Sequence, residues 1–164
     1  MTSSPDAELA ILRHAVRVVL LDARDRVLLM RWRLQSGDRI WITPGGGLDA
    51  GEDHREAARR ELEEEVGLAR ADLGPCVWLR EHTFAWQERN YRQRERFYLV
   101  RVGSHEVDRS GNDANELAVI EEFRWWRLSE LEASGETFAP RRIALHMRAL
   151  LEEPLPSHPI DVGV

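Results

Sequence analysis

The chain has 164 residues, of which 43% are hydrophobic, so it is long enough for one domain with a buried core. Its 23 basic residues, all of them arginine, and 29 acidic residues give a net charge of −6, so no general affinity for nucleic acid is expected. The sequence contains no signal peptide and no apolar run of membrane-spanning length, and Cys76 has no second cysteine to pair with, which together predict a cytoplasmic protein.

Two strands, at residues 14–21 and 26–32, open the predicted fold, and a third short strand follows at residues 40–43. The third strand runs through Pro44 into three consecutive glycines at residues 45–47. Because glycine adopts positive φ and lets a ligand approach the backbone closely, we expect a ligand-facing loop there.

A helix is predicted directly after the glycine loop. Asp53 and Glu56 have the spacing of a capping box at its start, and Gly67 is the type of residue at which a helix ends. Apolar residues recur at every fourth position between these ends, at Ala58, Leu62 and Val66. This stripe predicts that the helix packs with one side against a sheet.

The second half of the chain alternates strands with helical segments. The predicted elements are strands at residues 77–86, 95–102 and 122–128, a helical turn at 130–133 and a helix at 141–151. A polar, arginine-rich connection is expected at 86–95 and a second polar loop at 104–115. This order predicts one α/β domain over residues 13–151, with a mixed β-sheet and helices on both faces. Residues 1–12 and the proline-rich residues 152–164 are expected to be loosely held.

Three carboxylates share one face of the predicted helix. Glu61, Glu64 and Glu65 are spaced i, i+3, i+4, so their negative charges repel one another. A divalent cation with oxygen ligands relieves this repulsion, and Mg²⁺ or Mn²⁺ accepts carboxylates readily. A solvated acidic surface is the simpler explanation of a glutamate run, but the nearby glycines, Glu52 and Arg60 favour metal binding.

Residues 46–68 fit the pattern G-x5-E-x7-R-E-U-x-E-E-x-G-U, in which U is a bulky aliphatic residue, without a gap or a mismatch. The fixed positions are Gly46, Glu52, Arg60, Glu61, Glu64, Glu65 and Gly67. The chain therefore resembles the Nudix hydrolases, from about Arg13 to Leu151 and most specifically at this box. The resemblance implies an α/β/α sandwich. It also implies metal-assisted hydrolysis of a nucleoside diphosphate linked to another group.

The resemblance also implies roles for single residues. The expected metal ligands are Glu61, Glu64, Glu65, the carbonyl of Gly45 and Glu52. Glu52 could instead pair with Arg60, which would then orient the glutamates as part of the catalytic machinery. The catalytic base is either a box glutamate, with Glu64 and Glu61 as candidates, or a glutamate outside the box. Outside the box, Glu116 is the first choice and Glu121 the second.

The substrate is less well defined by the sequence. Gly46, Gly47, Trp86 and Arg94 are the candidate substrate-binding residues. Core packing explains most of the tryptophans, and a solvated, salt-bridged loop is the simpler explanation of Arg94. We expect a small nucleotide-type molecule and no nucleic acid, and the family is compatible with a homodimer. Short motifs typical of several Nudix subfamilies are absent. The alternative function is a non-catalytic nucleotide-binding module, which the intact glutamates disfavour.

Overall fold

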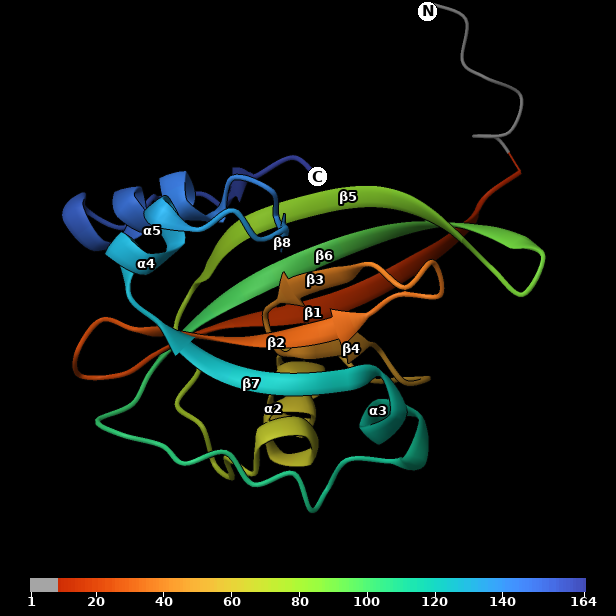
Figure 1. Ribbon diagram of the computed structural model, residues 1–164, viewed down its shortest axis with the longest axis horizontal. Helices are drawn as coiled ribbons and strands as arrows, with labels where there is room; N and C mark the ends of the chain where they lie inside the picture. The colour runs from red at the N-terminus through yellow and green to blue at the C-terminus, as the bar shows by residue number, and fades with distance from the viewer. Residues whose placement is uncertain (1–8) are drawn as a thin grey trace, which may run out of the picture.

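The computed structural model describes residues 9–164 as a curled sheet between two helical layers (Figure 1). The strands are β1 (Ile11–Leu21), β2 (Val27–Arg33), β3 (Arg39–Ile42), β4 (Gly45–Gly47), β5 (Cys76–Trp86), β6 (Arg89–Arg101), β7 (Ile120–Trp126), β8 (Phe138–Ala139) and β9 (Ile160–Asp161). The helices are α2 (His54–Val66), α3 (Ala114–Val119), α4 (Leu128–Ala133) and α5 (Ile143–Glu152). Helix α2 lies on one face of the sheet and α4 and α5 lie on the other (Figure 1). The predicted α/β/α sandwich with a mixed sheet is therefore confirmed.

The sheet is centred on β1. Its strand order is β8-β3-β2-β1-β6-β5-β9, with β4 also paired to β1 and β7 also paired to β2. The β1–β6 pair is parallel and runs from Ile11 opposite Tyr91 to Leu21 opposite Arg101. The β5–β6 pair is an antiparallel hairpin. Since β1 pairs with both β4 and β6, it links the glycine segment to the hairpin.

Hydrophobic residues fill both sides of the sheet. The α2 side contains Val16, Val18, Leu20, Leu28, Ala57, Ala58, Leu62, Val66, Tyr98 and Val100. The α4–α5 side contains Val19, Leu21, Leu29, Trp41, Trp78, Phe97, Trp126, Ile143, Met147 and Leu150. Neighbouring β1 residues alternate between the two clusters, as expected for a strand buried on both faces.

Helix α2 has the ends that its sequence predicts. The Asp53 side chain accepts a hydrogen bond from the Glu56 N–H, and the Glu56 side chain accepts one from the Asp53 N–H, which completes the capping box. Gly67 ends the helix at φ 73°, in the left-handed region that favours glycine. The predicted apolar stripe of Ala58, Leu62 and Val66 is fully buried.

The glycine segment and the arginine-rich connection were both predicted as loops, and both predictions are wrong. Gly45–Gly47 forms strand β4, which pairs with residues 15–17 of β1. The expected connection between Trp86 and Glu95 is mostly the first half of β6, because the chain reverses at Gln87 and Glu88 alone. These two residues have φ of 48° and 61°, values that glycine or asparagine usually adopts in a two-residue hairpin turn.

The end of the chain is also more ordered than expected. Ile160–Asp161 pairs with β5, and the buried Val162 donates its backbone N–H to the Leu79 carbonyl at 2.9 Å. At the other end, β1 begins at Ile11, whereas the sequence placed the start of the strand at residue 14. Of the segment predicted to be loosely held, residues 1–12, residues 1–8 lie outside the described residues, and Ile11 and Leu12 belong to β1. In the described part of the chain, no helix is both long and apolar enough to cross a membrane.

Candidate active site

The glycine strand β4 lies against the carboxylate face of α2. A side chain at Gly46 would place its Cβ 2.5 Å from Glu61 Oε1, so only glycine leaves room for this carboxylate. A Cβ at Gly45 would lie 2.0 Å from the Val16 carbonyl oxygen, and Gly45 has φ of 149°. Glycine at position 46 therefore allows Glu61 to approach β4, and glycine at position 45 allows β4 to lie close to the backbone of β1.

Glu65 is the most deeply buried of the three carboxylates. Its side chain accepts a hydrogen bond from the Gly45 N–H at 3.0 Å, and only 2% of the residue is exposed. Its second oxygen, Oε2, is buried and has no hydrogen-bond partner. Burial and the neighbouring Glu61 carboxylate raise the pKa of Glu65 well above its usual value. A buried carboxylate with a free oxygen beside another carboxylate is a suitable place for a cation.

Arg60 connects the glycine strand to the carboxylates. Its Nε and Nη2 donate to the two oxygens of Glu52, both at 2.8 Å, in a bidentate pair. The hydrogen bonds from Arg60 lower the pKa of Glu52 to about 2. Nη2 also donates to the Gly47 carbonyl at 3.1 Å. Of the two alternatives that the sequence left open for Glu52, the structure thus contains the ion pair with Arg60.

The remaining nitrogen of Arg60 lies between Glu61 and Glu64. Nη1 donates to Glu61 Oε1 at 3.0 Å and to Glu64 Oε2 at 3.2 Å, so one positive charge offsets the repulsion between these carboxylates. Among residues 9–164, no three acidic, histidine or cysteine side chains converge as a ready-made metal cage. The oxygen-rich cluster still fits a divalent cation, because it combines crowded carboxylates with the unpartnered Glu65 Oε2.

Glu116 lies near this cluster, although it is more than 50 residues away in the sequence. It is in the first turn of α3, where its backbone N–H donates to the Asp113 side chain at 2.8 Å. Burial, together with the negative charges of Asp113, Glu61 and Glu64, raises the pKa of Glu116 to about 7. Its Oε2 is buried without a hydrogen-bond partner. Glu121, the second choice from the sequence, instead pairs with Arg39 at 2.7 Å.

The two candidate substrate-binding residues on the hairpin do not lie beside the carboxylates. Trp86 is at the hairpin tip and is 49% exposed. Arg94 pairs with Glu81 at 2.7 Å and lies opposite His14 of β1, whose ring contacts His54 of α2. The structure therefore places Arg94 on the α2 side of the hairpin, where the salt bridge rather than the substrate explains it.

Two structural features of the site were missed in the sequence. Asn112 donates to the carbonyls of Glu64 and Glu65, at 2.9 Å each, and so fixes the loop that leads to α3. Arg17 donates to Glu95 at 3.2 Å and to the Gly45 carbonyl at 3.3 Å, which ties the glycine strand to β6. Both depend on contacts between distant segments, and a single sequence gives no local signal for them.

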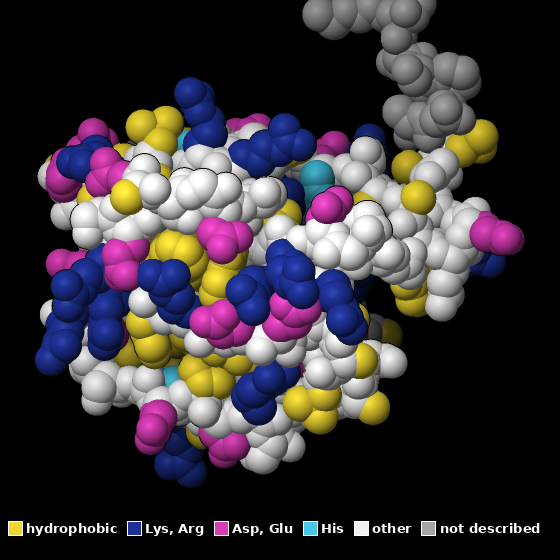
Figure 2. All heavy atoms as spheres, in the orientation of Figure 1, with side chains coloured by type: hydrophobic (Ala, Val, Ile, Leu, Met, Phe, Trp, Pro, Cys, Tyr) yellow, Lys and Arg dark blue, Asp and Glu magenta, His cyan; other side chains and the backbone are white. Residues whose placement is uncertain are grey.

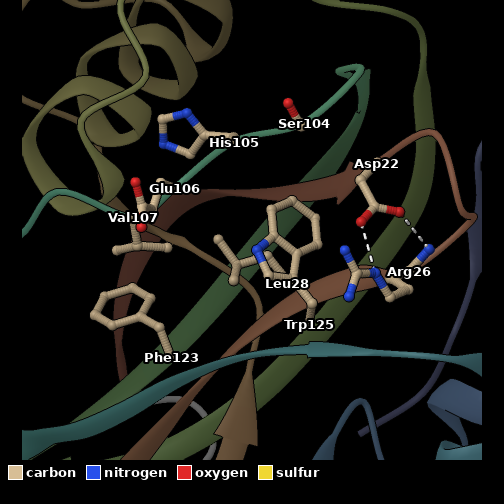
Figure 3. A pocket seen from close by; sticks show the side chains of 9 residues that line it. All are labelled: Asp22, Arg26, Leu28, Ser104, His105, Glu106, Val107, Phe123 and Trp125. Atoms are coloured by element: carbon tan, nitrogen blue, oxygen red, sulfur yellow. Dashed lines mark hydrogen bonds and ion pairs between the residues drawn. The ribbon is translucent and has the colours of Figure 1, made fainter.

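A cavity of about 560 Å³ lies on the α2 side, between the β1–β2 turn, β7 and the loop after β6 (Figure 3). Leu28, Phe123 and Trp125 form its apolar wall. Asp22 and Arg26 are paired with each other at 2.7 Å, and the His105 ring contacts the Val66 carbonyl at 2.7 Å. The lining contains none of the α2 carboxylates, so this cavity is separate from the candidate active site.

The sequence model of the NUDIX domain matches residues 11–147, which contain both the box and the strands that hold it. The chain belongs to the Nudix family. Its relatives include the RNA pyrophosphohydrolase of Sphingopyxis alaskensis, 30% identical over 145 residues that cover 82% of this chain and 88% of that protein. The RNA pyrophosphohydrolase of Rhodospirillum rubrum is 30% identical over 162 residues, which cover 93% of this chain and 94% of that protein. The Nudix domain and these relatives identify the chain as a hydrolase of pyrophosphate bonds.

Solved Nudix structures share the fold. The MutT Nudix hydrolase from Burkholderia pseudomallei has a TM-score of 0.56 and 29% identity, over 83% of this chain and 97% of that one. The dihydroneopterin triphosphate pyrophosphohydrolase of E. coli has a TM-score of 0.61 and covers 86% of this chain and 99% of its own. Because its identity to this chain is 16%, it supports the fold alone.

Replacing Gly46 with alanine in this Nudix box is expected to lower kcat about 100-fold, because the new Cβ displaces the Glu61 carboxylate by an ångström or so. The obstacle is the end of a side chain that can move, so we expect only a small loss of melting temperature. Steady-state kinetics and thermal unfolding of Gly46→Ala measure the two effects. Gly135→Ala is the control, because Gly135 has open space around it and no positive φ. Equal kinetic losses in both variants would contradict the proposed contact.

Glu52→Gln is expected to lower the free energy of unfolding by about 1–2 kcal/mol at neutral pH, since it breaks the charged pair with Arg60. The folded-state pKa of Glu52 is about 2, below its ordinary value of 4.5. The carboxylate therefore stabilises the fold above pH 4.5, and this contribution is lost as the pH falls towards 2. Urea unfolding of both proteins from pH 7 to pH 2 checks this. A difference that widens in acid would contradict it.

Proposed function

We propose that this Nudix hydrolase catalyses metal-dependent hydrolysis of a diphosphate bond in a nucleoside diphosphate linked to another group. The observation that carries the proposal is the contact between the glycine strand and the α2 carboxylates. A Gly46 Cβ would overlap Glu61, and the Gly45 N–H donates to Glu65. This arrangement leaves a backbone without side chains beside a strongly acidic face, where a polyphosphate bridged by cations can fit.

Glu61, Glu64 and Glu65 would hold Mg²⁺ or Mn²⁺, with the Gly45 carbonyl as a further oxygen ligand. Support for this assignment comes from the buried, unpartnered Glu65 Oε2 and from the all-oxygen set of donors. When bound, the ion supplies charge neutralisation for the phosphate oxygens and lowers the pKa of a water molecule.

The protein's own residues would orient the reactants. Arg60, fixed by its bidentate pair with Glu52, holds the Glu61 and Glu64 carboxylates in place. Glycine at position 46 leaves room for the Glu61 carboxylate, and glycine at position 47 leaves room for the Arg13 guanidinium, which would bind a phosphate. For the catalytic base, we propose Glu116, whose buried Oε2 has no competing partner and would accept a proton from the attacking water. A box glutamate is the alternative base.

The names of the relatives suggest a more specific substrate class. Several relatives at about 30% identity are named RNA pyrophosphohydrolase, which makes the 5′-phosphorylated end of RNA a candidate beside free nucleotides. Net charge alone argued against nucleic acid, but charge can be unevenly distributed over a surface. Both substrate classes present the same chemical group, a nucleoside 5′-polyphosphate.

The proposal is tested with a panel of nucleoside triphosphates, nucleotide sugars, ADP-ribose, dinucleoside polyphosphates and 5′-triphosphorylated RNA. Each compound is incubated with Mg²⁺, with Mn²⁺ or with a chelator, and the products are identified by mass. We expect release of phosphate or pyrophosphate, or of a nucleoside phosphate, from at least one class, and no release with the chelator. Nucleotide binding without hydrolysis across the panel would instead favour a non-catalytic nucleotide-binding module.

A further inference from the structure

The β5–β6 hairpin extends beyond the rest of the sheet (Figure 1). Strand β9 pairs with β5 only at Trp78 and Leu79, so the rest of β5 is an edge strand within the described chain. We call residues 80–95 the arm. An exposed edge strand usually carries charges that prevent pairing with other chains. The arm also carries a row of aromatic side chains, which such protection does not explain.

The aromatic rings of the arm stack in sequence along one face. The rings of His82 and Phe84 are 5.6 Å apart with an interplanar angle of 28°, and those of Phe84 and Tyr91 are 5.3 Å apart at 17°. Trp86 continues the row at the tip, 6.3 Å from Tyr91. Hydrophobic side chains are visible at this projecting end in the space-filling view (Figure 2). Half-exposed aromatic rings of this kind are surfaces on which nucleobases can stack.

The aromatic row lies on the same face as an arginine beside the glycine strand. Parallel partners point to the same side of a sheet, so Ile11 and Arg13 of β1 share the face of Tyr91 and Gln93. The Arg13 guanidinium lies over Gly47, where a Cβ would be 2.7 Å from Nη2. Gly47 pairs with Ala15 of β1, and Tyr91 pairs with Ile11. The four-residue step along β1 from Ala15 to Ile11 spans about 13 Å. This is the length of about four stacked nucleotides.

The cationic group beside the aromatic row is Arg13. The arm itself has four arginines and three glutamates, and Arg92 and Arg94 pair with Glu81 on its other face. Among the ion pairs of residues 9–164, none involves Arg13, whose guanidinium therefore has donors free for an anion. The aromatic row thus begins beside a cationic group over Gly47, on the sheet face opposite to α2, and runs away from the glycine strand.

From this continuity we infer that the arm binds a single-stranded nucleotide chain. Its 5′ phosphates would lie at the glycine strand, between Arg13 on one face and the α2 carboxylates on the other, and its following bases would stack on Tyr91 and Trp86. Aromatic stacking beside a cationic group is the usual means of binding single strands without sequence preference. The inference rests on the proposed function for the position of the 5′ end, and it selects a nucleotide chain over a free nucleotide as substrate.

The test compares 5′-triphosphorylated RNAs of one to six nucleotides with one another and with DNA of the same lengths. We expect kcat/KM of the unaltered protein to rise at least tenfold between one and about four nucleotides. The length preference is kcat/KM for the tetranucleotide divided by kcat/KM for the mononucleotide. In Trp86→Ala and Tyr91→Ala, this preference should fall about fivefold or more, because fivefold is the smallest effect expected when one stacked base is lost. Leu145→Ala, equally exposed on α5, is the control and should keep the ratio.

Binding is measured separately from hydrolysis, by fluorescence anisotropy of a labelled 5′-phosphorylated tetranucleotide in the presence of chelator. Tight binding that Trp86→Ala abolishes would support the arm even if no substrate were hydrolysed. Hydrolysis that is independent of length, with binding unchanged in both variants, would overturn the inference and leave the proposed function intact. A dimer that Trp86→Ala converts to a monomer, with no change in oligonucleotide binding, would also overturn it, because the surface would then join two copies of the chain.

Discussion

Glu64→Gln is expected to lower kcat about 10³-fold while the melting temperature stays unchanged. The side chain of Glu64 is 46% exposed and makes one hydrogen bond with Arg60, at 3.2 Å, so its charge contributes little to folding. The substitution keeps the size of the side chain but removes one negative charge from the proposed metal site. Steady-state kinetics over a range of Mg²⁺ concentrations should show both a lower kcat and a higher Mg²⁺ requirement.

The neighbouring Glu63→Gln is the matched control. Glu63 lies on the same helix but is exposed and outside the carboxylate face, so this variant should retain full activity. Similar activity in the two variants would exclude the carboxylate face of α2 as the catalytic centre. A loss in Glu64→Gln that excess Mn²⁺ partly restores would support the role of Glu64 as a metal ligand.

Glu95→Gln is expected to cause the largest loss of stability, about 3–5 kcal/mol or roughly 6–20 °C in melting temperature. The Glu95 carboxylate is buried and accepts hydrogen bonds from Arg17 at 3.2 Å, Arg80 at 3.1 Å and Gln93 at 2.8 Å. The glutamine leaves two largely buried arginines without their counter-charge. Since Arg17 also binds the Gly45 carbonyl, activity should fall as well.

The pH dependence of this effect follows from the charge of Glu95. Burial alone would raise the pKa of Glu95, but Arg17, His82 and Arg80 outweigh burial and hold that pKa well below its usual value. A lowered pKa stabilises the fold above the ordinary glutamate value of 4.5, and this stabilisation is lost as the pH falls through the folded-state value. The difference between the two proteins in urea unfolding should therefore be constant from pH 8 to about pH 5 and then narrow.

Glu81→Gln is the control for Glu95→Gln, since Glu81 lies on the opposite face of the same hairpin. It pairs with Arg94 at 2.7 Å, but both side chains are about half exposed, so the pair should contribute less than about 1 kcal/mol. Equal destabilisation by both substitutions would show that the buried network around Glu95 has no special role.

The sequence predicted the parts of the fold that local patterns determine. The capping box, the apolar stripe and Gly67 define α2, and runs of apolar residues define β1 and β2. It did not predict strand β4, because three glycines carry no side-chain pattern and pair with β1 only through the tertiary fold. The hairpin turn was missed because Gln87 and Glu88 adopt positive φ without the glycine or asparagine that usually marks such turns.

The candidate site was predicted to a similar extent. The box glutamates and Arg60 lie together, as their helical spacing requires, and the structure brings Glu116 near them. Arg13, Arg17 and Glu95 were not singled out, since their proximity to the glycine strand depends on the parallel β1–β6 pair between segments about 80 residues apart. Long-range pairing of this kind has no local sequence signal.

Mn²⁺ binding measured by electron paramagnetic resonance tests the central claim most directly, namely that the α2 carboxylates hold the ion on which hydrolysis depends. The titration compares the unaltered protein with Glu61→Gln, Glu64→Gln and the Glu63→Gln control. We expect saturable Mn²⁺ binding in the unaltered protein and in Glu63→Gln, and binding at least tenfold weaker in the other two variants. Equal Mn²⁺ affinity in all four proteins would contradict the account and would place any catalytic ion elsewhere.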